Sequence, residues 1–202
     1  MTSSADDQQL AQVRRRVFLA LFIALAVALR TVEFLLPNPI PWLRLGLANI
    51  LALTALFLYG SRELWTVSIG RILVGSLVLG NLFSPGFLLS LSGGLLATLT
   101  MDLGFRRFRP RIGPVGVSVL GALGHVFGQL LVAWLLIVRH SSIWLMLPFF
   151  LLFALISGMV NGIAADMLLK ALRKQPAFAA AGDRGDMTQS THSPDNSKSR
   201  KQ

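Results

Sequence analysis

Long apolar stretches, separated by short segments rich in polar and turn-forming residues, dominate the pattern of this chain. A helix that spans a bilayer needs roughly 20 mainly apolar residues. Stretches that meet or approach this length predict six membrane-spanning helices, at residues 17–36, 43–59, 64–82, 86–103, 114–138 and 143–172. The connections carry the breaker segments PNPIP, GSRE, FSPG and RPRIGP. The pattern therefore predicts an all-α integral membrane protein built as a six-helix bundle.

The composition supports this class of protein. Of the 202 residues, 53% are hydrophobic and only 14% are charged, whereas a soluble domain carries about 25% charged residues. The chain has no cysteine, which excludes disulfide bonds and thiolate metal sites. The first apolar stretch is longer than a signal-peptide core and lacks a small-residue cleavage site, so we expect a retained helix.

The distribution of positive charge predicts the orientation. A net charge of +10 would suggest nucleic-acid binding in a soluble protein, but here the basic residues gather in alternate connections, as the positive-inside rule describes. With both termini in the cytoplasm, the outer side receives only Arg44 and Arg139. The polar ends, residues 1–16 and 173–202, are expected to be disordered on either side of a membrane domain of residues 17–172. The inner side receives Arg14, Arg15, Arg16, Arg62, Arg106, Arg107, Arg109, Arg111, Lys170, Arg173 and Lys174.

Polar side chains within the predicted spans gather in the outer half of the bilayer. Such residues are costly in lipid and usually face the bundle interior or a cavity. His125 and Gln129 lie four residues apart and share one helix face, and the prolines of PNPIP stiffen the neighbouring outer loop. We predict a small-molecule pocket open to the outside, built from Arg30, Glu33, Arg44, Asn49, Arg71, Ser90, Ser92, His125 and Gln129.

Structural roles compete with binding roles at several of these positions. Arg30 and Glu33 are three residues apart, which also suits a structural ion pair at a helix end. Arg44 also fits the role of an interfacial residue that extends its charge to water. His125 also fits the role of a residue that forms a hydrogen bond between two helices. The two serines can satisfy their hydroxyls within their own helix. Arg71 is the strongest candidate, because it lies too deep in its span to reach water easily.

Small residues form stripes on several helices. Ala20, Ala24 and Ala28 recur every four residues, and at about 100° per residue their stripe points roughly 150° away from Arg30 and Glu33. This face is a candidate docking surface for another membrane protein, although alanine is also simply common in helices. The GxxxG pairs on the fifth and sixth predicted helices are interpreted as sites of close packing within the bundle.

Sequence motifs for catalysis are absent. The chain has no P-loop, no aspartate-rich motif for a metal diphosphate, no metal-ligand spacing of His, Asp and Glu, and no nucleophile elbow. We therefore expect a protein that is not an enzyme and needs no cofactor. A pocket without evident chemistry or an energy source is typical of a solute-binding membrane subunit that works with partner proteins.

Four segments, taken in order, resemble a known family: PNPIPWLRLGLANILAL, GRILVGSLVLGNLFSPGFLLSLSGGLLATLTMDL, GVSVLGALGHVFGQL and LPFFLLFALISGMVNG. They are similar to the bacterial Gx transporter family, also called heptaprenyl diphosphate synthase component I, over about residues 17–172. That family is similar to the S components of energy-coupling factor (ECF) transporters. The resemblance implies a six-helix protein of the bacterial cytoplasmic membrane that captures a vitamin-like or anionic solute. It also implies a transmembrane coupling subunit and ATPase subunits as partners, with Ala20, Ala24 and Ala28 contacting the coupling subunit.

This chain departs from the family's pattern at one position, and the resemblance leaves an alternative function open. The family often carries Asn directly after the histidine of helix 5, where this chain has Val126, so the ligand contacts are not carried over in detail. The alternative is a membrane accessory component of isoprenoid or quinone biosynthesis. Its cavity would accept a prenyl chain, and the arginines from Arg106 to Arg111 would hold a diphosphate at the inner surface. Residues that ionise a prenyl diphosphate are not evident, so the synthase name indicates association rather than catalysis.

The predicted topology can be tested by cysteine labelling, because the chain has no cysteine of its own. Single cysteines at Asn38, Ser84 and Ser141 should react with a membrane-impermeant thiol reagent added to intact cells, since these positions lie in outer connections. A cysteine at Arg109 should not react, since it lies in an inner connection. Labelling at Arg109 and at none of the other three positions would reverse the orientation and the direction in which the pocket opens.

Overall fold

The computed structural model describes residues 3–35, 46–108 and 111–175. This part of the chain is helical apart from short turns and contains no β-strand, which confirms the all-α expectation. Most of the predicted spans coincide with observed helices within a few residues. The elements are α1 (Ser3–Leu35), α2 (Ala48–Tyr59), α3 (Ser61–Val78), α4 (Pro85–Phe108), α5 (Pro114–Val132), the π-helix η1 (Ala133–Val138), the 3₁₀-helix η2 (Ser141–Met146) and α6 (Leu147–Arg173).

The first helix differs from the sequence-based expectation at its start. The sequence predicts disorder for residues 1–16, whereas α1 runs from Ser3 without interruption into the first apolar stretch. Ala, Gln, Leu and Arg in this segment have high helix propensity, and adding residues to an existing helix is far easier than nucleating a new one. At the other end α6 finishes at Arg173, where the predicted tail begins. Residues 176–202 lie outside the described part of the chain.

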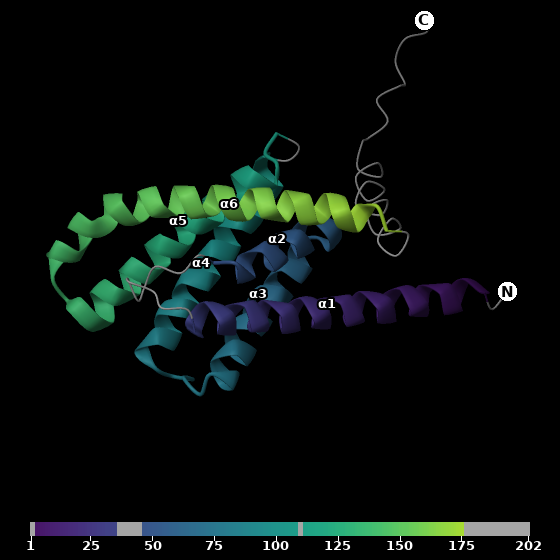
Figure 1. Cartoon of the computed structure of the whole chain (residues 1–202), viewed down its shortest axis with the longest axis horizontal. Helices are drawn as coiled ribbons and strands as arrows, with labels where there is room; N and C mark the ends of the chain where they lie inside the picture. The colour runs from purple at the N-terminus through teal and green to yellow at the C-terminus, as the bar shows by residue number, and fades with distance from the viewer. Residues whose placement is uncertain (1–2, 36–45, 109–110, 176–202) are drawn as a thin grey trace, which may run out of the picture.

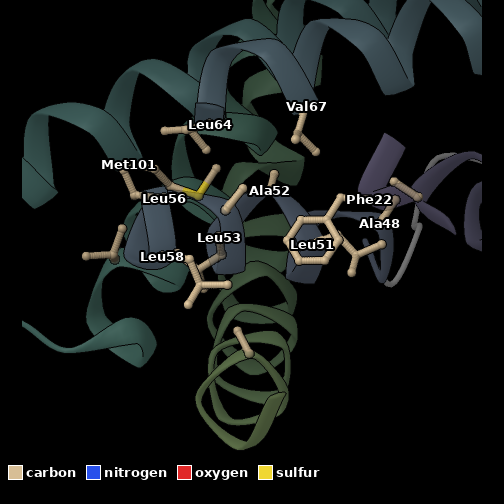
Figure 2. Packing of buried hydrophobic residues seen from close by; sticks show 14 of the residues in the cluster. Phe22, Ala48, Leu51, Ala52, Leu53, Leu56, Leu58, Leu64, Val67 and Met101 are labelled. Carbon is tan, nitrogen blue, oxygen red and sulfur yellow. The ribbon is translucent and has the colours of Figure 1, made fainter. Parts of the chain in front are cut away.

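The second helix is short and lies inside the bundle. α2 has 12 residues, so its length of about 18 Å is less than the thickness of a bilayer core. It contacts α1, α3 and α6, and its leucines pack with Phe22, Leu64, Val67 and Met101 of the surrounding helices (Figure 2). Gly60 then reverses the chain directly into α3 with φ +111°, which is strained for any residue with a side chain. Because neighbouring helices surround α2, it need not face lipid along a full span.

Three helices are long and apolar enough to cross a membrane, judged over the described residues: Pro85–Phe108, Pro114–Ile137 and Ile143–Arg173. The last of them exposes a continuous apolar stripe, formed by Leu152, Ile156, Val160, Ile163 and Met167, each more than half exposed. Large exposed patches of this kind are rare on soluble monomers. These three helices and the exposed apolar stripe of α6 indicate a membrane protein.

Glycines set the close approach of α4, α5 and α6. A Cβ added to Gly128 of α5 would lie 2.7 Å from the carbonyl oxygen of Ser92 on α4. A Cβ added to Gly162 of α6 would lie 2.5 Å from the Cα of Val115 on α5. Gly124 and Gly158, one turn before these glycines, make equally close approaches. The packing interpretation of both GxxxG pairs is confirmed, because only a hydrogen atom fits at these four crossings.

Charged residues link the helices at one end of the bundle. The start of α1 and the end of α6 lie toward the same end of the molecule (Figure 1). Arg15 of α1 forms an ion pair with the buried Glu63 near the start of α3. Arg106, near the end of α4, donates to Asp102 at 2.8 Å, and Asp102 also accepts from the indole of Trp65 on α3 at 3.2 Å. The basic residues near the start of α1 and near the ends of α4 and α6 thus share one end of the bundle, whereas Arg30 lies near the opposite end of α1.

Candidate functional site

A cavity of about 180 Å³ lies among α2, α3, α4, α5 and α6. Its lining includes the apolar side chains of Leu89, Leu130, Ile137, Phe150 and Phe153. Polar residues from five helices also line it. These residues are Asn49, Arg71, Ser90, His125, Gln129, Ser157 and Asn161. The cavity therefore suits a small ligand that carries both polar and apolar groups.

Arg71 is the most informative residue of the cavity. Its side chain is buried, with 8% of the residue surface exposed. One terminal nitrogen donates a hydrogen bond of 3.1 Å to the side-chain oxygen of Asn49 on α2, while the buried Nε has no partner among the described residues. A guanidinium group has five N–H donors in a planar fork. Arg71 thus brings a positive charge to the wall of the cavity.

Glu33 and Arg30 lie behind the cavity rather than in its wall. The carboxylate of Glu33 accepts a hydrogen bond of 2.6 Å from the backbone N–H of Leu47, directly before α2. This N–H is one of the donors that a helix start leaves without an intrahelical partner, and a negative charge there also favours the helix dipole. Glu33 thereby fixes the start of α2, two residues before Asn49. All three charged residues are buried, and Arg71 interacts electrostatically with both Arg30 and Glu33.

Glycines make room for the polar side chains of this site. A Cβ added to Gly75 of α3 would lie 3.0 Å from the Cδ of Arg30, so α1 and α3 approach each other across that arginine. A Cβ added to Gly93 of α4 would lie 2.9 Å from the Nδ1 of His125 and 2.7 Å from the Cγ of Gln129. The shared face predicted for these two residues of α5 therefore packs on Gly93 and reaches the cavity.

The structure brings together five of the nine predicted pocket residues in the cavity wall: Asn49, Arg71, Ser90, His125 and Gln129. Ser92 does not line the cavity, and its hydroxyl donates to the carbonyl of Leu89 at 3.1 Å, which is the local role that its spacing also allowed. Arg44 lies outside the described residues. On α1, Ala20, Ala24 and Ala28 are exposed while Arg30 and Glu33 are buried, as the angular separation predicts.

Other residues of the site are missed by the sequence argument. Asn161 and Ser157 line the cavity from α6, and the amide of Asn161 donates to the Ser157 hydroxyl at 3.4 Å. Asn161 and Ser157 lie four residues apart, a spacing that places both on one helix face. The π-helix η1 contributes Ala133 and Ile137 to the wall. Nothing in the sequence signals this π-helix, although such segments often occur at functional sites.

Comparisons with known proteins give one match. The family model of heptaprenyl diphosphate synthase component I matches residues 22–168. No curated protein and no solved structure matches the chain. The matched range contains every cavity-lining residue, and it confirms the resemblance found in the sequence under its heptaprenyl name. Within the described residues, no cluster of three or more His, Asp or Glu side chains has an arrangement that could hold a metal ion.

The buried charge of Glu33 should be important for stability. Glu33→Gln keeps an acceptor for the Leu47 amide but removes the negative charge near Arg30 and Arg71, so it should lower the free energy of unfolding in detergent by about 3–5 kcal/mol. The matched control is Asp166→Asn, which removes an acidic partner of the exposed Lys170 on α6 and should cost about 0.5 kcal/mol or less. Equal, small losses in chemical unfolding experiments would contradict an electrostatic role of Glu33.

Proposed function

Since this chain belongs to the heptaprenyl diphosphate synthase component I family, we propose that it is a membrane-embedded, ligand-binding component of isoprenoid or quinone biosynthesis. In this role it binds a small molecule and presents it to a partner. It performs no catalytic step itself and carries no cofactor. The family name supports the pathway. The single observation that supports ligand binding is Arg71, a buried cation at the wall of a cavity.

Burying the positive charge of Arg71 is costly unless acceptors surround it. A cation within a membrane domain is tolerated when it pairs with acceptors or faces a polar cavity. Asn49 provides one neutral hydrogen-bond acceptor for Arg71. A ligand with a negative or strongly polar group would provide further acceptors. The size of the cavity adds a restriction, because a cavity of about 150 Å³ holds one benzene molecule. The enclosed space of about 180 Å³ would hold only part of a complete prenyl chain.

We place the protein in the bacterial cytoplasmic membrane with six spans and both termini inside. Support comes from the common end of the bundle shared by the start of α1 and the end of α6 (Figure 1), where several basic residues lie. In this orientation the cavity opens toward the outside. At the inner surface Arg106, Arg107 and Arg111 are exposed, and Arg106 is positioned by Asp102 and Ser61. These arginines would attract the anionic headgroups or diphosphates expected at that surface.

Purification from native membranes tests this function. The wild-type chain should retain a small molecule and proteins of isoprenoid metabolism, identified by mass spectrometry. Arg71→Ala should reduce the retained small molecule by more than tenfold, because a charge-assisted contact of about 1.4 kcal/mol or more is lost. Arg71→Lys should restore it only in part, since an ammonium lacks the planar fork of the guanidinium.

Arg62→Gln provides the control for this experiment, because Arg62 is exposed on the same helix and distant from the cavity lining. It should retain the ligand at the wild-type level. A folded Arg71→Ala protein that keeps the wild-type amount of ligand would remove Arg71 from the site and would contradict the proposed function.

The second candidate function is that of an S component in an importer of the ECF type. The specific observation that favours it is the exposed stripe of Ala20, Ala24 and Ala28 on α1. A flat stripe of small side chains permits the close approach of another membrane helix, here that of a coupling subunit bound to ATPase subunits. The cavity would then capture a vitamin-like or anionic solute from outside.

Substitution of the central alanine separates the two candidates. In an importer, Ala24→Leu should abolish co-purification with a transmembrane coupling subunit while ligand binding stays within twofold of wild type, because the added side chain prevents close helix contact. Ala171→Leu, at an exposed alanine near the end of α6, should change neither property. Unchanged uptake and partner binding in a folded Ala24→Leu protein would reject the importer.

A further inference from the structure

We propose that Arg106, held in place by Asp102, forms a binding site for a phosphate group at the inner surface of the membrane. The phosphate belongs to an anionic lipid headgroup or to a diphosphate. This inference rests on the orientation that is part of the proposed function. The site is separate from the cavity, because neither Arg106 nor Asp102 lines that cavity.

Asp102 anchors Arg106 from inside the bundle. The two residues lie one turn apart on α4, and the Nε of Arg106 donates to the Asp102 carboxylate at 2.8 Å. The same carboxylate accepts from the indole of Trp65 on α3 at 3.2 Å, and the Nε of Arg106 also donates to the hydroxyl of Ser61 at 3.3 Å. Only 10% of the Asp102 side chain is exposed, against 64% of the Arg106 side chain. Bonds from α3 and α4 thus fix the base of an exposed guanidinium.

The bonding of Arg106 leaves the outer edge of its guanidinium for a ligand. Every hydrogen bond and ion pair that it makes with described residues uses Nε. A guanidinium carries one N–H on Nε and four on its two terminal nitrogens. Arg15 differs, because one of its terminal nitrogens already pairs with Glu63. The terminal nitrogens of Arg106 therefore present the planar fork that binds two phosphate oxygens at once.

The position of Arg106 along α4 places it at the depth of lipid phosphates. α4 has 24 residues, so its length is about 36 Å, and the hydrocarbon core of a bilayer is about 30 Å thick. Arg106 and Arg107 lie in the last turn of α4. In the proposed orientation this turn reaches the inner headgroup region, where anionic phosphates are concentrated.

Two further exposed arginines strengthen the attraction for an anion. Arg107 follows Arg106 directly, and its guanidinium lies 6.0 Å from the centre of the Phe108 ring. The chain turns back after α4, because the backbone N–H of Arg111 donates to the carbonyl of Phe108 at 2.7 Å. Arg111 therefore stays close to the end of α4. Clustered positive charge of this kind raises the local concentration of anions.

Three probes test the site on the full chain purified in detergent. Dioctanoyl phosphatidylglycerol supplies a lipid phosphate, and dioctanoylglycerol has the same acyl chains without phosphate; both are followed by native mass spectrometry. Inorganic diphosphate supplies a free phosphate and is followed by titration calorimetry. The wild-type chain should bind at least one of the two phosphate probes saturably, and it should bind dioctanoylglycerol about tenfold more weakly or not at all.

A pair of charge-conserving variants separates a built site from general attraction. Arg106→Lys keeps the positive charge but loses the planar fork, so it should weaken phosphate binding by about fivefold or more. The matched control is Arg173→Lys, at an exposed arginine at the end of α6, and it should stay within about twofold of wild type. Attraction by charge alone predicts no change in either variant.

Asp102→Asn tests the positioning of Arg106. It removes a negative charge, so attraction by charge alone predicts tighter binding of an anion, whereas loss of the anchor predicts weaker binding. In the Arg106→Lys background the same change should weaken binding no further, because the fork is already absent. Melting temperatures identify the folded variants, and Arg106→Lys decides the question of the site if Asp102→Asn does not fold.

The outcomes identify the ligand or overturn the site. Arg106-dependent binding of phosphatidylglycerol alone identifies a lipid headgroup, and Arg106-dependent binding of diphosphate identifies a free phosphate. No saturable binding of either probe, or equal effects of Arg106→Lys and Arg173→Lys, overturns the phosphate site. Tighter binding in a folded Asp102→Asn protein overturns the positioning by Asp102. The proposed function fails on a different result, namely native purification in which no ligand depends on Arg71.

Discussion

The carboxylate of Glu33 is the interaction on which the arrangement of the site depends. It joins the C-terminal part of α1 to the start of α2 through the Leu47 amide, and it places a negative charge near two buried arginines. Without this group, the start of α2 would lose a capping acceptor and the cluster would hold only positive charge. The positions of Asn49 and Arg71 at the cavity therefore follow from a residue that does not itself line the cavity.

Much of the fold could be predicted because apolar stretches report directly on helices that face lipid or the core. The third to sixth stretches match observed helices closely, and Arg71 stands out as a cation deep in one of them. The central position of α2 could not be predicted, since its composition resembles that of a lipid-facing helix. The bond from Glu33 to Leu47 and the contribution of Asn161 also depend on how helices are rotated and paired, which periodicity in one helix does not determine.

Small residues illustrate the same limit in a more specific way. The glycines of α5 and α6 and the alanines of α1 have the same spacing of four, yet Gly128 and Gly162 are buried in helix crossings whereas Ala24 is exposed. Spacing identifies a face on which a close approach is possible. The packing of all the helices decides whether a helix of the same chain occupies that face, and the alanines of α1 remain exposed.

The single-residue turn at Gly60 has a consequence for the order in which the site is built. It makes α2 and α3 one helical hairpin, and the two ends of the Asn49–Arg71 hydrogen bond are only 22 residues apart along the chain. Closing so short a loop costs little conformational entropy, and local contacts of this kind form early. During synthesis the Asn49–Arg71 pair can thus assemble before α5 and α6 leave the ribosome. These later helices then add His125, Gln129, Ser157 and Asn161 and complete the cavity around a pair that is already in place.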